Sequence, residues 1–239
     1  MADVVRRPRP EAEELDLRVL YEDESLIAVD KPAGVVVHPT YRNWSGTLLN
    51  ALLWHVREMP GQRPSILTRL DKDTSGVVLA ARTPEVQAIV QRDAAAGRVR
   101  KEYLAVVAAA LATGDRGTIE LPLARSAEDR RVVVVSDAGV RCETRYEVVS
   151  RGAGRSLVRC ELVTGRTHQI RVHLAARGWP ILGDATYGVP AADVPRQALH
   201  AWRIRLPHPR TRVALEIESP WPADLPPFST TNYQLPSTN

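Results

Sequence analysis

The second half of the chain consists mainly of short segments rich in branched apolar and aromatic residues, separated by glycine, aspartate and proline. Such segments are typical of β-strands, and short links between them favour pairing of strands that are neighbours in sequence. The pattern therefore predicts an antiparallel meander and restricts the chain to folds built on a large sheet. The expected strands cover residues 101–109, 118–123, 130–136, 140–150 and 156–164, followed by 198–207 and 212–219.

Helices are expected to interrupt the strands. In residues 46–58, leucines recur at helical spacing after Thr47, whose hydroxyl can cap the helix. Further on, Thr83 is the expected N-cap of a second helix and Pro84 fits its first turn. Gly97 can end this helix in the left-handed conformation.

A third helix is expected in the segment that follows residue 164. Thr167 is its predicted N-cap, Ile170 and Leu174 point inward, and Gly178 ends it. Residues 17–39 add strands broken by turn-like clusters. Because strands predominate and a few helices accompany them, the sequence predicts the α+β class, with a mixed, mainly antiparallel sheet and flanking helices.

Domain organisation is expected to be simple. The 239 residues can bury a sizeable core, and no internal repeat or linker divides them. The two ends lack any periodicity that would bury them. We therefore expect a flexible tail at residues 1–16, one compact domain at 17–225 and a second flexible tail at 226–239.

The chain shows no sign of export or membrane insertion. Its longest apolar run, residues 103–112, is about half the ~20 residues that a membrane helix needs. The acidic residues near the start are untypical of a transit peptide. We therefore expect a cytoplasmic protein in which Cys142 and Cys160, each within an expected strand, are reduced and buried.

The basic side chains are unusual in kind more than in number. The net charge is only +4, but 29 arginines accompany 3 lysines. Arginine holds phosphate through a planar pair of donors and stacks on bases, which suits a nucleic-acid partner. Codon usage in a G+C-rich genome explains the same ratio, so composition permits such a partner without demonstrating one.

Asp71 lies where a polar turn leads into an apolar run, in RLDKDTSGVVLAAR. Asp73, Thr74, Ser75 and Gly76 form the turn, and a buried strand begins at Val77. A carboxylate on such a loop is either a turn-forming residue or part of a site. These residues alone leave both interpretations open.

Two further polar clusters accompany this turn. Tyr103 alternates with apolar residues in KEYLAVV and lies either in the core or on a functional face of a strand. Arg166, His168 and Arg171 lie on or beside the first turn of the third helix, where the helix dipole disfavours positive charge. An outside anion, such as a carboxylate or phosphate, would explain this placement, and Arg171 is suited to pair with an aspartate. A solvated basic face is the alternative.

Several classes of chemistry lack their motifs. The six histidines form no HExxH or HxH pair and there is no CxxC, so we expect no metal site. Neither GxxxxGK[ST] nor GxGxxG is present, and GxSxG is also missing. These absences argue against a nucleotide cofactor and a serine hydrolase.

Seven segments follow one another in a recognisable order. They read LRVLYEDESLIAVDKPAGVVVHP, GTLLNALL, RLDKDTSGVVLAAR, RKEYLAVV, LVTGRTHQIRVHLAARGWPILGDATYG, LHAWRIRLPHP and IESPWPADL. Together they resemble the RluA-type pseudouridine synthases over about residues 17–222. The resemblance implies the pseudouridine synthase fold, an α+β fold with an active-site cleft. It also implies an enzyme that breaks the N-glycosidic bond of a uridine in ribosomal or transfer RNA and rejoins the uracil through carbon 5, without cofactor or metal.

The resemblance also assigns residue roles. Asp71 matches the family's catalytic aspartate, and Arg171 matches the arginine that pairs with it. Tyr103 matches the tyrosine that packs on the target base, and Arg69 the arginine that enters the RNA stack as the uridine is flipped out. An ionised aspartate can attack the sugar carbon or remove a proton to give a glycal, and the sequence leaves both routes open.

RNA binding is expected to depend on the catalytic domain. Only about sixteen residues precede the first expected strand, so we expect no N-terminal S4 module. A basic groove around Arg69, Lys101, Arg166, Thr167 and His168 should then supply much of the salt-dependent affinity. We expect a monomer.

One departure from the family pattern and two other functions must be weighed. Thr68 stands where many relatives have histidine, which puts any role of that imidazole in doubt. A non-catalytic RNA-binding protein could keep the same fold. A glycoside hydrolase using Asp71 and Asp73 is disfavoured, because two carboxylates in one turn cannot flank a sugar.

Overall fold

The computed structural model describes residues 10–40 and 43–228. Among these residues, ten strands form one sheet and two short strands form another. The strands are β1 (Val19–Glu22), β2 (Leu26–Lys31), β3 (Ser65–Ile66), β4 (Ser75–Ala81), β5 (Arg100–Val107), β6 (Arg116–Glu120), β7 (Leu123–Arg125), β8 (Val133–Val135), β9 (Glu143–Gly152), β10 (Arg155–Leu162), β11 (Leu199–Pro207) and β12 (Ala214–Glu218). The helices are α1 (Leu48–His55), α2 (Pro84–Ala95) and α3 (Gln169–Ala176).

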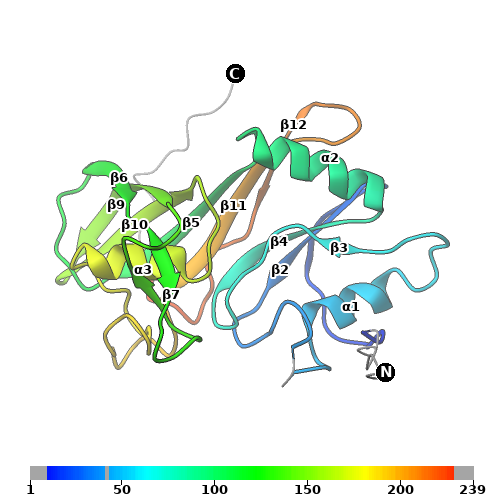
Figure 1. The fold of residues 1–239 in the computed structure, drawn as a ribbon. Coiled ribbons are helices and arrows are strands. Elements are labelled where there is room, and N and C mark those ends of the chain that lie inside the picture. The colour runs from blue at the N-terminus through cyan, green and yellow to red at the C-terminus, as the bar shows by residue number, and fades with distance from the viewer. Residues whose placement is uncertain (1–9, 41–42, 229–239) are drawn as a thin grey trace, which may run out of the picture.

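The main sheet runs through the whole molecule in the order β1-β2-β4-β11-β5-β10-β9-β6, with β3 on β4 and β12 on β11 (Figure 1). Its paired strands are antiparallel except β4 and β11, which pair in parallel where Ser75 lies opposite His200. The predicted mixed, mainly antiparallel sheet with flanking helices is therefore confirmed.

The predicted simple meander was wrong. β5 pairs with β10 and β11 rather than with β6, and β7 and β8 leave the main sheet to form their own pair. Turn residues mark where strands end, but they do not select partners for strands that are distant in sequence. In β5 the last six residues are all buried, so this strand needs a neighbour on each side.

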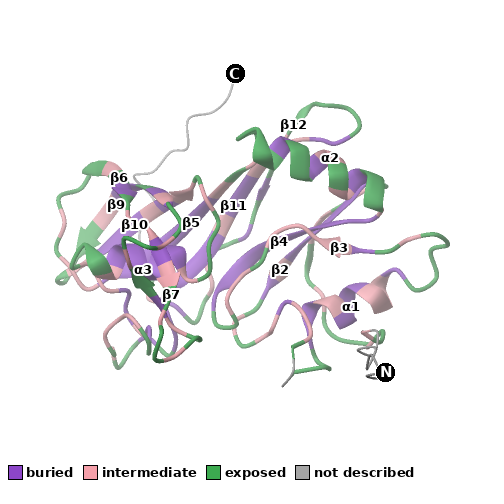
Figure 2. Cartoon of the chain, viewed as in Figure 1, coloured by how far each residue is buried: buried purple, intermediate pink, exposed green. Residues whose placement is uncertain are grey.

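α1 and α2 cover opposite faces of the β2 and β4 region, and Figure 1 shows these strands between the two helices. Leu52 of α1 packs in one cluster with Val78, whereas Val90 of α2 packs in another with Leu79. Neighbouring residues of β4 point to opposite faces, so the strand is buried along its whole length. Figure 2 shows the same burial along the central strands.

The helix boundaries test the predicted caps. Thr47 caps α1, and Thr83 caps α2 with Pro84 in its first turn, as predicted. Gly97, with φ of +71°, follows α2 in the left-handed conformation. The predicted N-cap Thr167 was wrong, because α3 begins one residue later with His168 as N-cap, and no side chain caps that helix.

The ends of the predicted domain can be followed only in part. Residues 1–9 and 229–239 of the predicted tails lie outside the described residues. Glu13 and Glu11 accept hydrogen bonds from Gly46 and Asn50, and Trp221 donates one to Pro226. The boundaries at 17 and 225 stay predictions.

Cys142 and Cys160 are buried free thiols, as predicted. Burial raises the pKa of Cys160 to about 12. In the part of the chain that the structure describes, no helix is long and apolar enough to span a bilayer.

Candidate active site

Asp71 lies on the loop that leads into β4, and several buried side chains hold this loop. Lys31 donates to the carbonyl oxygen of Lys72 at 2.8 Å, and Arg196 donates to that of Asp73 at 3.2 Å. Gln197 donates to the Thr74 hydroxyl at 2.6 Å. The Asp71 side chain itself is 25% exposed, so a fixed backbone presents a carboxylate that solvent or a ligand can reach.

Arg171, on the first turns of α3, joins two carboxylates. Its Nη1 donates to Oδ2 of Asp71 at 2.9 Å, across 100 residues of sequence. Its Nε and Nη2 donate to the two oxygens of Asp184 at 2.6 and 2.8 Å. The pairing that the resemblance implied between Asp71 and Arg171 is thus present in the structure.

Asp184 anchors this arrangement. Its side chain has no exposed surface, and its Oδ1 also accepts hydrogen bonds from the backbone of Thr186 and Tyr187. Burial acts to raise the pKa of Asp184, but the hydrogen bonds and charge of Arg171 outweigh it and lower the pKa below its ordinary value. For Arg171, burial is likewise outweighed by Asp184 and Asp71, which raise its pKa. The pair is therefore ionised and fixed.

His168 lies beside Asp71 in a strained backbone conformation. Its φ is +54°, in the left-handed region that residues other than glycine rarely adopt. Its Nδ1 lies 2.8 Å from the hydroxyl of Tyr187, which also accepts from the Val133 N–H at 2.7 Å. Its Nε2 lies 3.9 Å from Oδ1 of Asp71. Burial lowers the pKa of His168, so a neutral imidazole faces the carboxylate.

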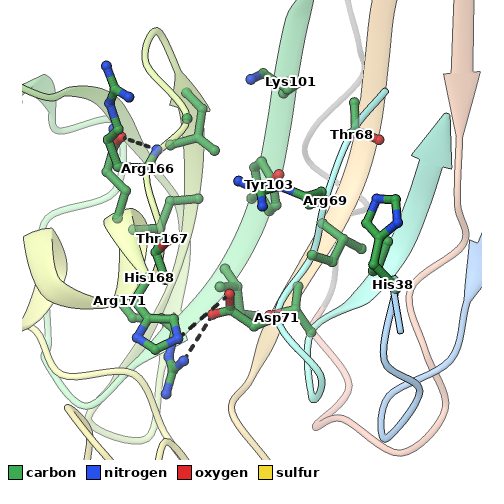
Figure 3. Close-up of a pocket in the computed structure, with 18 of the residues that line it drawn as sticks. His38, Thr68, Arg69, Asp71, Lys101, Tyr103, Arg166, Thr167, His168 and Arg171 are labelled. Carbon is green, nitrogen blue, oxygen red and sulfur yellow. Dashed lines mark hydrogen bonds and ion pairs between the residues drawn. The ribbon is translucent and has the colours of Figure 1, made fainter. Parts of the chain in front are cut away.

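Tyr103 projects from β5 toward the same space (Figure 3). Only 7% of it is exposed, and burial together with the nearby charge of Asp71 raises the pKa of its hydroxyl. The phenol is therefore neutral at ordinary pH. Its ring supplies an apolar wall beside the carboxylate.

All the predicted site residues line one pocket of about 460 Å³, which is large enough for a small ligand. In Figure 3, Asp71, His168 and Arg171 lie at one end of it and Lys101 lies at the other. Burial lowers the pKa of Lys101. The predicted residues that line the pocket are Arg69, Asp71, Lys101, Tyr103, Arg166, Thr167, His168 and Arg171.

Sequence reasoning missed the residues that support these groups. Asp184 and Tyr187 belong to the matching GDATYG segment, but nothing in the local pattern places them beneath α3. His38 also lines the pocket, and burial followed by the charge of Arg69 lowers its pKa. Thr68 stands where many relatives have histidine. Its hydroxyl accepts a hydrogen bond from the Leu79 N–H at 2.9 Å, which fixes the start of the loop.

Among residues 10–40 and 43–228, no group of three or more histidine, cysteine, aspartate or glutamate side chains is placed to hold a metal ion.

The chain is similar to known proteins along most of its length. The "Ribosomal large subunit pseudouridine synthase D" of Nitrosomonas europaea is 42% identical over 225 residues, which cover 90% of this chain and 65% of the relative. The protein of the same name from Pseudomonas aeruginosa is 41% identical, covering 89% of this chain and 71% of the relative. The chain thus spans about two thirds of the length of these relatives.

A solved structure and a family model give the same result. "Human RNA Pseudouridylate Synthase Domain Containing 1" superimposes with a TM-score of 0.69 and 28% identity, over 90% of this chain and 86% of that one. The family described as RNA pseudouridylate synthase matches residues 25–176. The chain therefore belongs to the RNA pseudouridylate synthase family of isomerases.

Proposed function

We propose that this RNA pseudouridine synthase isomerises a uridine in large-subunit ribosomal RNA. Support for the class of RNA comes from the relatives named for the ribosomal large subunit. The unit responsible would span residues 17–225 and work in the cytoplasm as a monomer. The observation that carries the proposal is the Asp71–Arg171 pair, 2.9 Å apart in a pocket that Tyr103 also lines.

Asp71 is the reacting group in this proposal. Arg171 holds it through the contact at 2.9 Å, and its partial exposure leaves it accessible to a sugar. As a nucleophile it would attack C1′ while the bond from C1′ to N1 breaks, and as a base it would remove the C2′ proton to give a glycal. In the glycal route, too, the bond from C1′ to N1 breaks, so both routes free the uracil, which then turns to bring C5 to C1′. C5 bonds to C1′ while the Asp71–C1′ bond breaks in the first route, or while C2′ takes back its proton from Asp71 in the second. The C5 proton is then lost and N1 is protonated.

Tyr103 would pack on the target base, and the basic residues that line the pocket would contact the rest of the RNA. An everted base loses its stacking in the RNA, which costs a few kcal/mol, and packing on the Tyr103 ring would offset part of this cost. Arg69 is exposed at the rim of the pocket, where it could occupy the space that the uridine leaves. Lys101 and Arg166, with Thr167 and His168 beside them, would contact the backbone.

The test is to incubate the purified protein with transcripts of large-subunit ribosomal RNA and to detect pseudouridine by mass spectrometry. Pseudouridine at a defined position, absent with Asp71→Asn, supports the proposal. RNA binding without product would favour a non-catalytic RNA-binding protein. Release of free uracil would favour a glycosidase.

A further inference from the structure

A second cavity adjoins the active-site pocket. It has a volume of about 250 Å³. Leu67, Thr68, Lys101 and Leu162 line both cavities, so the two meet at these residues. From this junction the second cavity extends to the C-terminal end of α2, which lies above the sheet in Figure 1.

Half of the residues that line the second cavity are apolar. Its volume is below the ~300 Å³ at which cavities for whole small-molecule ligands usually begin, so it suits one planar ring system. Several of its wall residues are only half-buried, which leaves apolar surface open to a ligand. The apolar lining residues are Leu67, Leu79, Val90, Ala94, Val99, Leu162 and Val163.

Charged side chains surround this apolar space. Arg100 and Lys101 make no side-chain hydrogen bond or ion pair to other residues in the described part of the chain. Arg145 is paired with Glu143 at 3.1 Å, and Glu161 lies opposite Arg145 in the sheet. Two cations are thus left for an outside anion, and Lys101 is the one that lines both cavities.

We propose that the second cavity binds the base of an unpaired RNA nucleotide next to the target uridine, with the intervening phosphate on Lys101. A base can be held between apolar side chains whatever its identity, and lysine holds phosphate as a point charge. Lys101 lies at the junction of the two cavities, where the backbone between two neighbouring nucleotides would pass. This inference rests on the proposed function.

Glu161, which lines the second cavity, affects which base the subsite should prefer. A carboxylate repels the phosphate, so the backbone would lie on the side of Arg100 and Lys101. The carboxylate can accept a hydrogen bond from an exocyclic amino group, as on cytosine. The subsite should therefore favour a base that carries an amino group over uracil.

Ala94→Trp tests the subsite, because Ala94 is exposed on α2 and its enlarged side chain would fill the cavity. Ala88→Trp is the matched control, since Ala88 is exposed on the same helix and does not line the cavity. The substrate is a fragment of large-subunit ribosomal RNA that contains the uridine at which the wild-type protein forms pseudouridine. The variant loses the packing of one base on apolar side chains, so we expect KM to rise roughly 5- to 70-fold with kcat retained. The control should behave as the wild type.

A second measurement uses the wild-type protein and RNA with one abasic nucleotide, moved stepwise through the positions that flank the target. At one position the abasic nucleotide should raise the KM of the wild type as much as Ala94→Trp raises KM on intact RNA. On that abasic RNA, Ala94→Trp should raise KM little further. Equal KM values for the two tryptophan variants, or an abasic series without effect, would overturn the subsite. Should Ala94→Trp fail to fold, the abasic series decides alone. Absence of pseudouridine with the wild type and unaltered RNA would instead reject the proposed function.

Discussion

Asp71 and Asp184 bind the same guanidinium from different sides, at 2.9 Å and 2.6 Å from nitrogens of Arg171. Asp184 is fully buried and uses both oxygens, whereas Asp71 is partly exposed and uses one. Arg171 is thus anchored by one carboxylate while it holds the other. The buried aspartate keeps the arginine in place whether or not Asp71 is engaged with a substrate.

Asp184→Asn should destabilise the protein, because it leaves the buried charge of Arg171 without its main partner. We expect the free energy of unfolding, measured with urea, to fall by about 3–5 kcal/mol, and kcat to fall with it. Asp193→Asn is the control, since Asp193 pairs with Arg155 at the surface, and its stability should stay close to that of the wild type. Equal stability of the two variants would contradict the anchoring role.

At position 168, glycine should give a more stable protein than alanine, which is the reverse of the usual order. At φ of +54°, a side chain costs roughly 1–2 kcal/mol that glycine does not pay. His168→Gly should therefore be more stable than His168→Ala in urea unfolding, although glycine in helices and strands is normally the less stable choice. A more stable alanine variant would show that the left-handed conformation is not imposed there.

His200 should make stability depend on pH. Burial lowers its pKa to about 4, and its Nδ1 lies 2.9 Å from the Ser75 hydroxyl. The unfolded chain, with an ordinary histidine pKa near 6.5, binds the proton first as pH falls. The stability contributed by neutral His200 is therefore complete above about pH 6.5 and is lost progressively toward pH 4. The difference in unfolding free energy between wild type and His200→Gln should shrink over this range, and a constant difference would contradict the assignment.

Tyr103→Phe should separate stacking from proton transfer. The ring keeps its packing surface, so the Kd for RNA should hardly change. If the hydroxyl helps to remove the C5 proton, product formation should slow by roughly 100-fold or more. The measurement is single-turnover formation of pseudouridine, and an unchanged rate would limit Tyr103 to packing.

Local patterns predicted local structure well. The Thr83 cap with Pro84, and the left-handed Gly97 that ends the helix, depend only on neighbouring residues. The start of α3 at His168 could not be read in this way. Its N-cap has no side-chain hydrogen bond to the helix, and the conformation is held from outside by Tyr187.

Long-range relationships were not predictable from the residues alone. Pairing of β5 with β10 depends on which surfaces remain to be buried after the other strands have paired. Asp184 anchors Arg171 through a direct hydrogen bond, and hydrophobic periodicity does not reveal such a contact. The meeting of Asp71, Tyr103 and Arg171 in one pocket was expected from the family resemblance rather than from spacing.

The most direct test of the central claim compares Asp71→Asn with the wild type on the same ribosomal RNA. Asparagine keeps the shape of the side chain but removes the charge that would attack the sugar or take its proton. We expect the Kd for RNA to stay within a few-fold of the wild type and pseudouridine formation to be abolished over many wild-type turnover times. Substantial product from Asp71→Asn would contradict the assignment of Asp71 as the reacting group.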